Sequence, residues 1–512
     1  MEDTEPVVRL CRRRGTGGGL LLAAAALLAL FAAPPRAALP PPTIDADAWF
    51  EAFKAEATDA ELYRFLYAMP KGGDLHHHTS GSILDDWAYD MALALAARGY
   101  RFLTRVRVDN CRPPGSAAVA GRPPLLLFHT LQESSWRALP ACERGEYKRL
   151  EALTADERRA WLDSMMLDKA HEGRAEFFGK HWQRMGDLYA NPYYSAEALV
   201  RNMQALGREG LLYLEPMVAV LGHRRPDGSR FSADEAAAIF RRRLAAPDAR
   251  ATGVTVRLQV AVLRFAPDAE ETLRRLYGFV DRHRDLWVAV NLVGREDNDK
   301  GFPLRFLDTL RDLRRRHHGV RLAIHAGEVD EPNHHVRDTL LLGADRIGHG
   351  VNLITDPETL RLMRHGPYLV EINLISNLLL GYVDDYREHP FPEYLRTGIP
   401  VALSTDDRGM WDSNMTDEFF VAVREFNLSW SELKRLSRNS LRHAFVGDAL
   451  RARLLERLDR RLAAFEHAIA RDPARALATD ARTHGFLCRR YALCGPGDGA
   501  PAAAGSGSGD GP

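Results

Sequence analysis

Eight short apolar runs, separated by longer stretches with helical periodicity, constrain the fold of this chain more than any other feature. Such runs, alternating with helices, are typical of parallel strands that are covered on both faces. They predict an α/β protein with a closed (β/α)8 barrel, and an open doubly wound sheet is the alternative. No glycine-rich phosphate loop follows the first run, which favours the barrel. The runs are DLHHH (74–78), LLYLEPMV (211–218), VTVRLQVAVL (254–263), WVAVNLVG (287–294), VRLAIHAGE (320–328), DRIGHG (345–350), YLVEINLIS (368–376) and IPVALSTDD (399–407).

The interval between the first two runs is too long for one strand crossover, since it exceeds 130 residues. We therefore expect an inserted subdomain over about residues 100–165, within a barrel domain that spans 71–490. Helical periodicity over 45–70 predicts one or two helices in a short N-terminal arm, 39–70. The last segment, 495–512, is rich in Gly, Ala, Ser and Pro and has little to bury, so we expect it to be disordered.

The N-terminus has the pattern of a secretory signal. Arginines at 9 and 12–14 precede an apolar stretch, 20–33, that ends at Pro34 and Pro35. This stretch is shorter than the ~20 residues of a spanning helix, although an uncleaved anchor is the alternative. We expect residues 1–38 to be removed, which leaves no membrane span and an exported protein, periplasmic or secreted.

Four cysteines remain after the signal, an even number in a chain expected to enter an oxidising compartment. The natural pairs are Cys111 with Cys142 and Cys488 with Cys494, and four free thiols are the alternative. Lys plus Arg and Asp plus Glu each total 69, so the formal net charge is zero. No overall field attracts nucleic acid or an anionic membrane, and we expect a small-molecule partner.

Polar side chains stand where four of the eight runs end. The carboxyl ends of barrel strands surround one mouth, where functional groups converge. Taken alone, a histidine there is usually packed and hydrogen-bonded, and an aspartate often caps the next helix. Together the seven residues predict a catalytic site: His76, His78, His325, Glu328, His349, Asp406 and Asp407.

The spacing of the histidines suggests a metal. Residues i and i+2 of a strand point to the same side, so His76 and His78 can share an ion while His77 faces away and is structural. Imidazoles with a carboxylate suit zinc and hydrolysis, and they also accept cobalt or iron. The fourth run ends in Val293 and Gly294 instead of a lysine that could bridge two metals, so we expect one metal ion.

The motifs MPKGGDLHHH, NLVGREDN, IHAGEVD, RIGHG, the ISN of EINLISN and STDD occur in this order. The set resembles the adenosine deaminase family, which belongs to the metal-dependent amidohydrolase barrels, over about residues 60–450. The MPKG opening, the cysteine-bearing insertion and the signal are most similar to its secreted branch, the adenosine deaminase-related growth factors.

The resemblance implies hydrolytic deamination of adenosine, or of 2′-deoxyadenosine, to inosine and ammonia. Glu328 would protonate purine N1, and His349 would take a proton from the metal-activated water and position it. Asp407 would hold purine N7 and Gly294 would contact the base. One zinc ion per chain would be held by His76, His78, His325 and Asp406.

The sequence also departs from the family pattern. Where family members carry an aspartate for the ribose 5′-hydroxyl, this chain has Thr79 and Ser80, and we take Ser80 as a substrate contact. The usual Cys-Pro is Asn373-Leu374, and Arg408 replaces a proline, but neither change removes a metal ligand or an acid. The N-terminal arm is short beside the growth factors' dimerisation region, so a homodimer is left open.

The sequence bears on three other functions. An amidohydrolase for another 6-aminopurine derivative or a nucleotide is the main alternative, although no Arg or Lys cluster beside a motif offers a phosphate cradle for AMP. Cytidine-type zinc deaminases use a paired-cysteine motif, and Cys488 and Cys494 are too far apart for it. An exported binding or signalling protein without catalysis is disfavoured because Glu328 and every expected zinc ligand are present.

Overall fold

The structure, a computed structural model, describes residues 45–111, 124–296 and 300–494. The described residues all belong to one compact unit. The predicted signal (1–38) and the predicted disordered tail (495–512) therefore lie outside the described residues.

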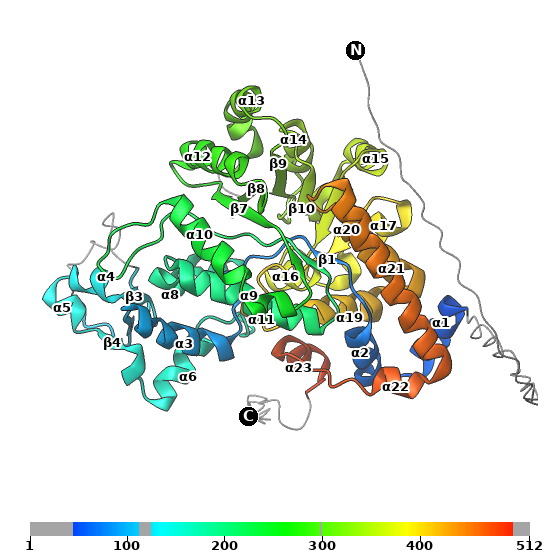
Figure 1. Cartoon of the computed structure of the whole chain (residues 1–512), viewed down its shortest axis with the longest axis horizontal. Coiled ribbons are helices and arrows are strands. Elements are labelled where there is room, and N and C mark those ends of the chain that lie inside the picture. Colours follow the sequence, from blue (N-terminus) through cyan, green and yellow to red (C-terminus); the bar gives the residue numbers. More distant parts are fainter. Residues whose placement is uncertain (1–44, 112–123, 297–299, 495–512) are drawn as a thin grey trace, which may run out of the picture. The chain divides into compact units, whose positions relative to one another are not determined.

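The described chain alternates strands and helices along most of its length (Figure 1). The strands are β1 (Gly73–Asp74), β2 (Phe102–Arg105), β3 (Thr130–Gln132), β4 (Tyr147–Arg149), β5 (Tyr213–Leu214), β6 (Thr255–Val256), β7 (Leu258–Leu263), β8 (Trp287–Val293), β9 (Arg321–Ala326), β10 (Arg346–His349), β11 (Leu369–Ile372) and β12 (Val401–Leu403). The helices are α1 (Ala46–Glu56), α2 (Asp59–Ala68), α3 (Asp85–Ala94), α4 (Glu133–Arg137), α5 (Ala141–Arg144), α6 (Ala155–Asp163), α7 (Arg174–Glu176), α8 (Trp182–Met185), α9 (Pro192–Arg208), α10 (Ala233–Leu244), α11 (Pro247–Ala251), α12 (Ala269–Arg282), α13 (Leu307–Arg316), α14 (His335–Leu341), α15 (Pro357–His365), α16 (Leu374–Leu379), α17 (Phe391–Thr397), α18 (Arg408–Trp411), α19 (Met415–Phe426), α20 (Trp430–Arg442), α21 (Asp448–Arg471), α22 (Pro473–Leu477) and α23 (Gly485–Tyr491).

Each of the eight apolar runs contains a strand, and these strands are parallel. One sheet has the order β12-β11-β10-β9-β8-β7 and a second has the order β1-β5-β6. Neighbours in space are thus neighbours along the chain, and the order never reverses as it does in a doubly wound sheet. The α/β prediction is confirmed, and the doubly wound alternative does not fit.

A single closed sheet of eight strands is not formed. Strands β1 and β5 are only two residues long, so their pairing ends before it can join the two sheets into one. Isolated parallel bridges connect the sheets instead, between His77 and Asp406 at one junction and between Met217 and Gln259 at the other. The eight runs lie in two linked sheets because each of the first two contains only two residues of regular strand.

Local sequence signals explain where several helices begin. Helix α2 starts with a capping box in which Thr58 and Glu61 satisfy each other's backbone N–H groups. The same arrangement opens α20 through Ser429 and Glu432. Helices α1 and α2 occupy the segment predicted to be helical before Pro70. Helices α12, α13 and α14 cover the outer side of β7–β9 (Figure 1).

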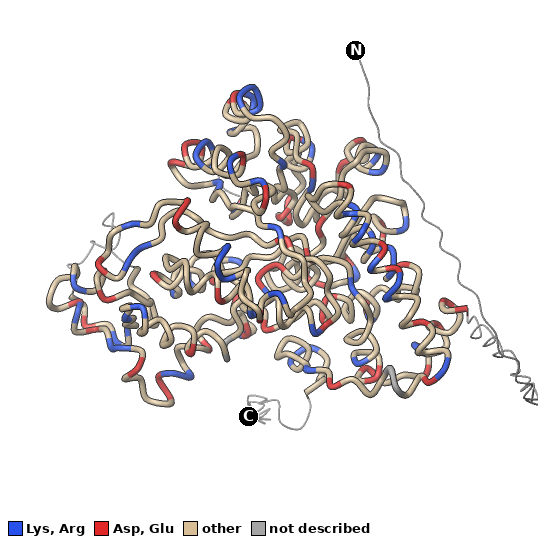
Figure 2. The backbone as a smooth tube through the Cα atoms, viewed as in Figure 1, with Lys and Arg blue, Asp and Glu red and all other residues tan. Residues whose placement is uncertain are grey.

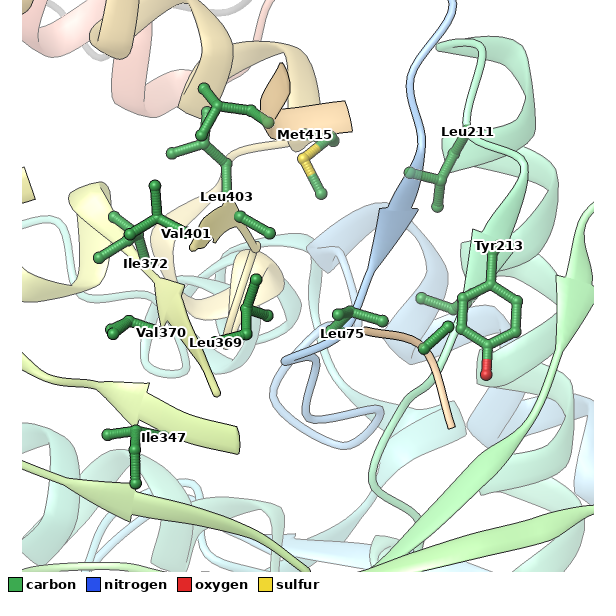
Figure 3. Packing of buried hydrophobic residues seen from close by; sticks show 14 of the residues in the cluster. Leu75, Leu211, Tyr213, Ile347, Leu369, Val370, Ile372, Val401, Leu403 and Met415 are labelled. Carbon is green, nitrogen blue, oxygen red and sulfur yellow. The ribbon is translucent and has the colours of Figure 1, made fainter. Parts of the chain in front are cut away.

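The hydrophobic core extends along both faces of the parallel strands (Figure 3). Ile347, Val370 and Val401 come from three neighbouring strands and are completely buried. Leu75 and Tyr213 fill the same core beside β1 and β5. Because both faces are covered, these strands read in the sequence as continuous apolar runs and not as an alternation.

The long interval after β1 contains a separate antiparallel sheet of order β3-β2-β4. A disulfide joins Cys111 to Cys142 in this region, and another joins Cys488 of α23 to Cys494 beyond that helix. Both predicted disulfides are therefore confirmed. The exact limits of the insertion, predicted at about 100–165, stay a prediction.

Acidic and basic residues are interspersed along the described chain (Figure 2). This distribution agrees with a formal net charge of zero. Among the described residues, no helix is both long and apolar enough to cross a membrane.

Candidate active site

Three of the predicted metal ligands and His349 come together from segments far apart in the sequence. His76 follows β1, His325 lies in β9, His349 ends β10 and Asp406 follows β12. One potential ligand atom from each of these four lies within 4.8 Å of the others. His78 forms a second such group with Asp406 and Asp407. The four predicted zinc ligands thus fall into two groups that share Asp406, and the predicted proton acceptor His349 joins the first.

The distances place these side chains around one centre. The Nε2 atoms of His78 and His325 are 3.2 Å apart. Asp406 Oδ1 lies 3.3 Å from His78 Nε2 and 3.4 Å from His76 Nε2. His349 Nε2 is 3.8 Å from Asp406 Oδ2. Three imidazoles and one carboxylate with such spacing form a donor set that suits a zinc-like ion.

Hydrogen bonds behind the histidines fix which nitrogen faces the centre. His76 Nδ1 donates to Glu371 Oε2 at 2.8 Å, and His325 Nδ1 donates to Asn291 Oδ1 at 2.9 Å. Each ring then presents Nε2 to the cluster, which is how metal-binding histidines are normally held. His76 Nε2 is buried and has no hydrogen-bond partner among the described residues. These residues fit a bound metal ion.

His349 is held in the same way. Its Nδ1 donates to Asn377 Oδ1 at 2.9 Å, and Asn377 Nδ2 donates to His389 Nε2 at 2.8 Å. Burial, reinforced by the nearby His76, lowers the pKa of His349 to about 4 although Asp406 opposes this shift. His349 is therefore neutral near pH 7 and can accept a proton through Nε2.

The electrostatics of the cluster favour a cation. Burial favours the neutral form of Asp406, but the adjacent imidazoles of His76 and His78 hold the pKa of this carboxyl well below its ordinary value. Burial opposes the charged form of His76 as well, yet Asp406 and Glu371 raise its pKa to about 10. These carboxylates thus stabilise a positive charge between them, and a metal ion would compete with the proton on His76.

His77 does not belong to the cluster. Its Nδ1 lies 3.0 Å from Thr405 Oγ1 and 3.4 Å from Asp74 Oδ2, on the side away from the metal ligands. Asp74 Oδ2 in turn accepts a hydrogen bond from Thr405 Oγ1 at 2.6 Å. As predicted, His77 offers no atom to either group of potential ligands, and its structural role stays a prediction.

The backbone is left-handed at two residues of the cluster. His349 has φ 62° and Asp406 has φ 53°, and a non-glycine residue adopts this region at a cost of about 1–3 kcal/mol. Gly348 precedes His349, and a Cβ there would lie 2.7 Å from His76 Cε1. In the RIGHG motif, the left-handed backbone thus directs His349 into the site, and Gly348 leaves room for the ring of His76.

Glu328 is the buried acid beside the cluster. It follows β9, is 5% exposed, and its Oε1 lies 3.8 Å from His349 Nε2. Burial, followed by the charges of Asp406 and Glu296, raises the pKa of this carboxyl well above its ordinary value. The Glu328 backbone N–H donates to Glu296 Oε1 at 2.5 Å, and Glu296 pairs with Arg264 at 3.2 Å. The raised pKa favours the protonated carboxyl, which is the form that can donate to a heterocyclic nitrogen.

Glu328 and three of the predicted metal ligands line a cavity of about 440 Å³. This volume is within the ~300–1,000 Å³ of small-molecule sites. Glu328, Asp407, Gly294 and Ser80 all contribute to its lining, so the predicted acid and the predicted substrate contacts share one space. Burial, with the charge of Asp406, raises the pKa of Asp407 well above its ordinary value. None of the described residues that line the cavity is lysine or arginine.

Two sets of residues were missed by the sequence reasoning. Glu371, Asn291 and Asn377 orient the histidines, and the first two stand out as polar residues inside apolar strand runs, a signal that could have revealed them. The second set is an aromatic wall over the cavity, for which the sequence offered no periodic signal. It consists of Phe177, Phe178, Trp182, Tyr189 and Phe265.

Comparison with known proteins gives consistent matches. The adenosine deaminase family model matches residues 195–461. An adenosine deaminase of Serratia proteamaculans is 28% identical over 350 residues, which are 64% of this chain and 96% of that protein. One from Enterococcus faecalis is 35% identical over 140 residues, 27% of this chain and 41% of that protein.

The solved structures agree on the fold. A zinc-bound amidohydrolase from Burkhoderia ambifaria superposes with a TM-score of 0.58 at 20% identity, covering 81% of this chain and 96% of that chain. None of these matches tests the similarity to the growth factor branch, which stays a prediction. The family model covers 267 of the 512 residues, counted from 195 to 461, and includes His325, Glu328, His349 and the Asp406-Asp407 pair. The chain belongs to the adenosine deaminase family.

Proposed function

We propose that this protein hydrolyses the 6-amino group of adenosine to give inosine and ammonia. Family membership makes it a hydrolase that acts on carbon–nitrogen bonds. The observation that carries the proposal is the buried Glu328 carboxyl, whose raised pKa keeps a proton beside a histidine and aspartate cluster in a small-molecule cavity.

The chain's own groups account for the proton movements. Glu328 donates a hydrogen bond to purine N1, which makes C6 more electrophilic. His349, neutral and held by Asn377, accepts a proton from the water that attacks C6. Asp407 and the backbone at Gly294 hold the base in the cavity. Water adds to C6 while N1 takes the proton of Glu328, and ammonia leaves with the proton that His349 passes to it. The C6 hydroxyl then gives its proton back to Glu328, and inosine is formed.

The cofactor in this proposal is one zinc ion per chain, held by His76, His78, His325 and Asp406, with His349 adjoining them. A bound zinc ion would act as a Lewis acid and bring the pKa of water close to 7. The nitrogen and oxygen donors support this choice, and hydrogen bonds from behind orient two of them, His76 and His325. Cobalt and iron accept similar donors and are the alternatives.

The lining of the cavity favours a nucleoside over a nucleotide. A phosphate group needs cationic partners, and the described lining contains no lysine or arginine. Thr79 and Ser80 line the cavity where a carboxylate was expected for the ribose, so its sugar contacts here are neutral hydroxyls. Adenosine is therefore the proposed substrate, and 2′-deoxyadenosine or another uncharged 6-aminopurine derivative is the alternative.

We also propose that the protein is exported. Two disulfides support this proposal, because disulfides persist in oxidising compartments. The arginine and leucine pattern of residues 1–38 supports it independently. A homodimer stays a prediction. We further infer that the two linked sheets act as one barrel around the site, since bridges join them at both junctions.

The test is a spectrophotometric assay of adenosine conversion by the zinc-loaded protein. Glu328→Gln should lower kcat by about 10²–10⁴-fold while the zinc content is unchanged, because the amide cannot supply the proton. Glu331→Gln, an exposed glutamate in the same loop, is the matched control and should be as active as wild type. No conversion by wild type would refute the proposed function, and equal rates in wild type and Glu328→Gln would refute the mechanism.

A further inference from the structure

A second large cavity lies at the opposite ends of the parallel strands from the active site. Its volume is about 590 Å³. Residues at or just before the amino ends of β8, β9, β10 and β11 line it, together with the end of α12 and the connection between α20 and α21. It shares no lining residue with the active-site cavity. Any ligand bound here therefore occupies a separate site.

The charged side chains that line this cavity are mainly cationic. Asp345 is its only acidic residue among the described chain, against five arginines. The arginines come from four separate segments, so their convergence is a property of the fold and not of one charged run. They are Arg284, Arg321, Arg346, Arg442 and Arg451.

Acidic partners offset part of this charge, but spare donors remain. Four of the five arginines have acidic partners. Asp281 pairs with Arg284, Asp448 with Arg451, Asp345 with Arg321, and both Glu215 and Glu371 with Arg346. Arg442 is exposed and has no side-chain partner in the described chain. The Nε atom of Arg451 is buried and has no hydrogen-bond partner among the described residues.

Backbone groups add to this preference for negative charge. Helix α21 begins beside the cavity, where Gly447 is the N-cap residue and no side chain caps the first N–H groups. The N-terminus of a long helix carries partial positive charge and free N–H donors, which favour anions. Tyr368 and Phe445 supply an aromatic wall beside these donors.

We propose that this cavity binds a small phosphate-bearing anion. Arginine forks match the geometry of phosphate oxygens, and the free donors of Arg442 and Arg451 stand beside the uncapped start of α21. The volume is within the ~300–1,000 Å³ of small-ligand sites, so an organic phosphate fits as well as the free ion. This proposal does not depend on the deaminase activity.

The test is isothermal titration calorimetry of the full-length, zinc-loaded protein with two probes. Inorganic phosphate represents the free ion, and uridine 5′-diphosphate represents an organic phosphate whose base is not a purine. Tighter binding of the second probe would assign the site to an organic phosphate, and equal binding would assign it to phosphate itself. We expect saturable binding of at least one probe below about 10 mM.

Two variants assign the binding to this cavity. Arg442→Gln and Arg284→Gln should each weaken binding about tenfold, because each removes a charge-assisted contact. Arg242→Gln changes an exposed arginine of α10 outside the cavity and should leave the affinity unchanged. Arg346 is not altered, since it also holds Glu371. The absence of saturable binding to wild type, or equal affinities in wild type and both cavity variants, would overturn the proposal.

Discussion

The carboxyl and amino ends of the same parallel strands differ in both charge and burial. At the carboxyl ends, His76, Glu328 and Asp406 are at most 5% exposed and gather around a candidate metal centre. At the amino ends, arginines line an open cavity, and the side chain of Arg321 is 57% exposed. Catalysis benefits from groups removed from water, whereas capture of an anion requires only accessible donors.

The two ends are joined by one buried chain of hydrogen bonds. Arg346 lines the amino-end cavity and donates through Nε to Glu371 Oε1 at 2.6 Å. Glu371 accepts from His76 at the carboxyl end, and Arg346 Nη2 also donates to Glu215 Oε1 at 2.6 Å. Parallel strands place these residues in register across β10 and β11, where Arg346 and Gly348 pair with Leu369 and Glu371. We therefore expect substitutions of buried groups to change activity or stability strongly and substitutions of exposed groups to change them little.

The largest loss of activity is expected at Asp406, which both groups of potential metal ligands share. Asp406→Ala should abolish zinc retention and lower kcat/KM for adenosine at least about a thousand-fold, because a Lewis acid contributes several kcal/mol to such a reaction. Metal analysis of the purified variant and the inosine assay measure both quantities. A variant that keeps one zinc ion and near wild-type activity would remove Asp406 from the metal site.

The next effect concerns the residue that connects the two ends. Arg346→Met leaves the carboxylates of Glu215 and Glu371 buried without their cation, which should lower the free energy of unfolding by about 3–5 kcal/mol. Arg321→Met, the control on the neighbouring strand, breaks an exposed pair with Asp345 and should cost less than about 1 kcal/mol. Urea denaturation followed by circular dichroism measures both. Similar losses for both variants would contradict the contrast between buried and exposed charge.

The smallest effect tests how the carboxyl end recognises a sugar. The Thr79 hydroxyl is buried in the cavity lining and has no hydrogen-bond partner among the described residues. Thr79→Val keeps the shape and removes this group, so KM for adenosine should rise about three- to tenfold with little change in kcat.

The control for this prediction is Thr339→Val. Thr339 Oγ1 is likewise buried without a partner in the described chain, but it lies on α14 and does not line the cavity. Its KM should equal that of wild type. If Thr79→Val also leaves KM unchanged while wild type deaminates adenosine, Thr79 does not contact the substrate.

Much of the candidate site could be predicted from the sequence. The rule that alternate strand residues face one side separated His77 from His76 and His78, and the structure confirms this separation. Capping residues such as Ser429 act on the backbone within three residues, so helix starts of this kind are encoded locally. The single closed sheet was not formed, because the short extent of β1 and β5 depends on how their neighbours bend.

The sequence by itself determined the parallel α/β class, the order of the site motifs and the residue types that could hold a metal ion, because these follow from local periodicity and side-chain chemistry. Only the tertiary structure decided which imidazole nitrogens face the centre, through Glu371 and Asn291, and that Glu328 is buried beside them. It also brought arginines from four segments to the far end of the strands. Such contacts join residues distant along the chain, and their geometry depends on how strands and helices pack, which no local pattern encodes.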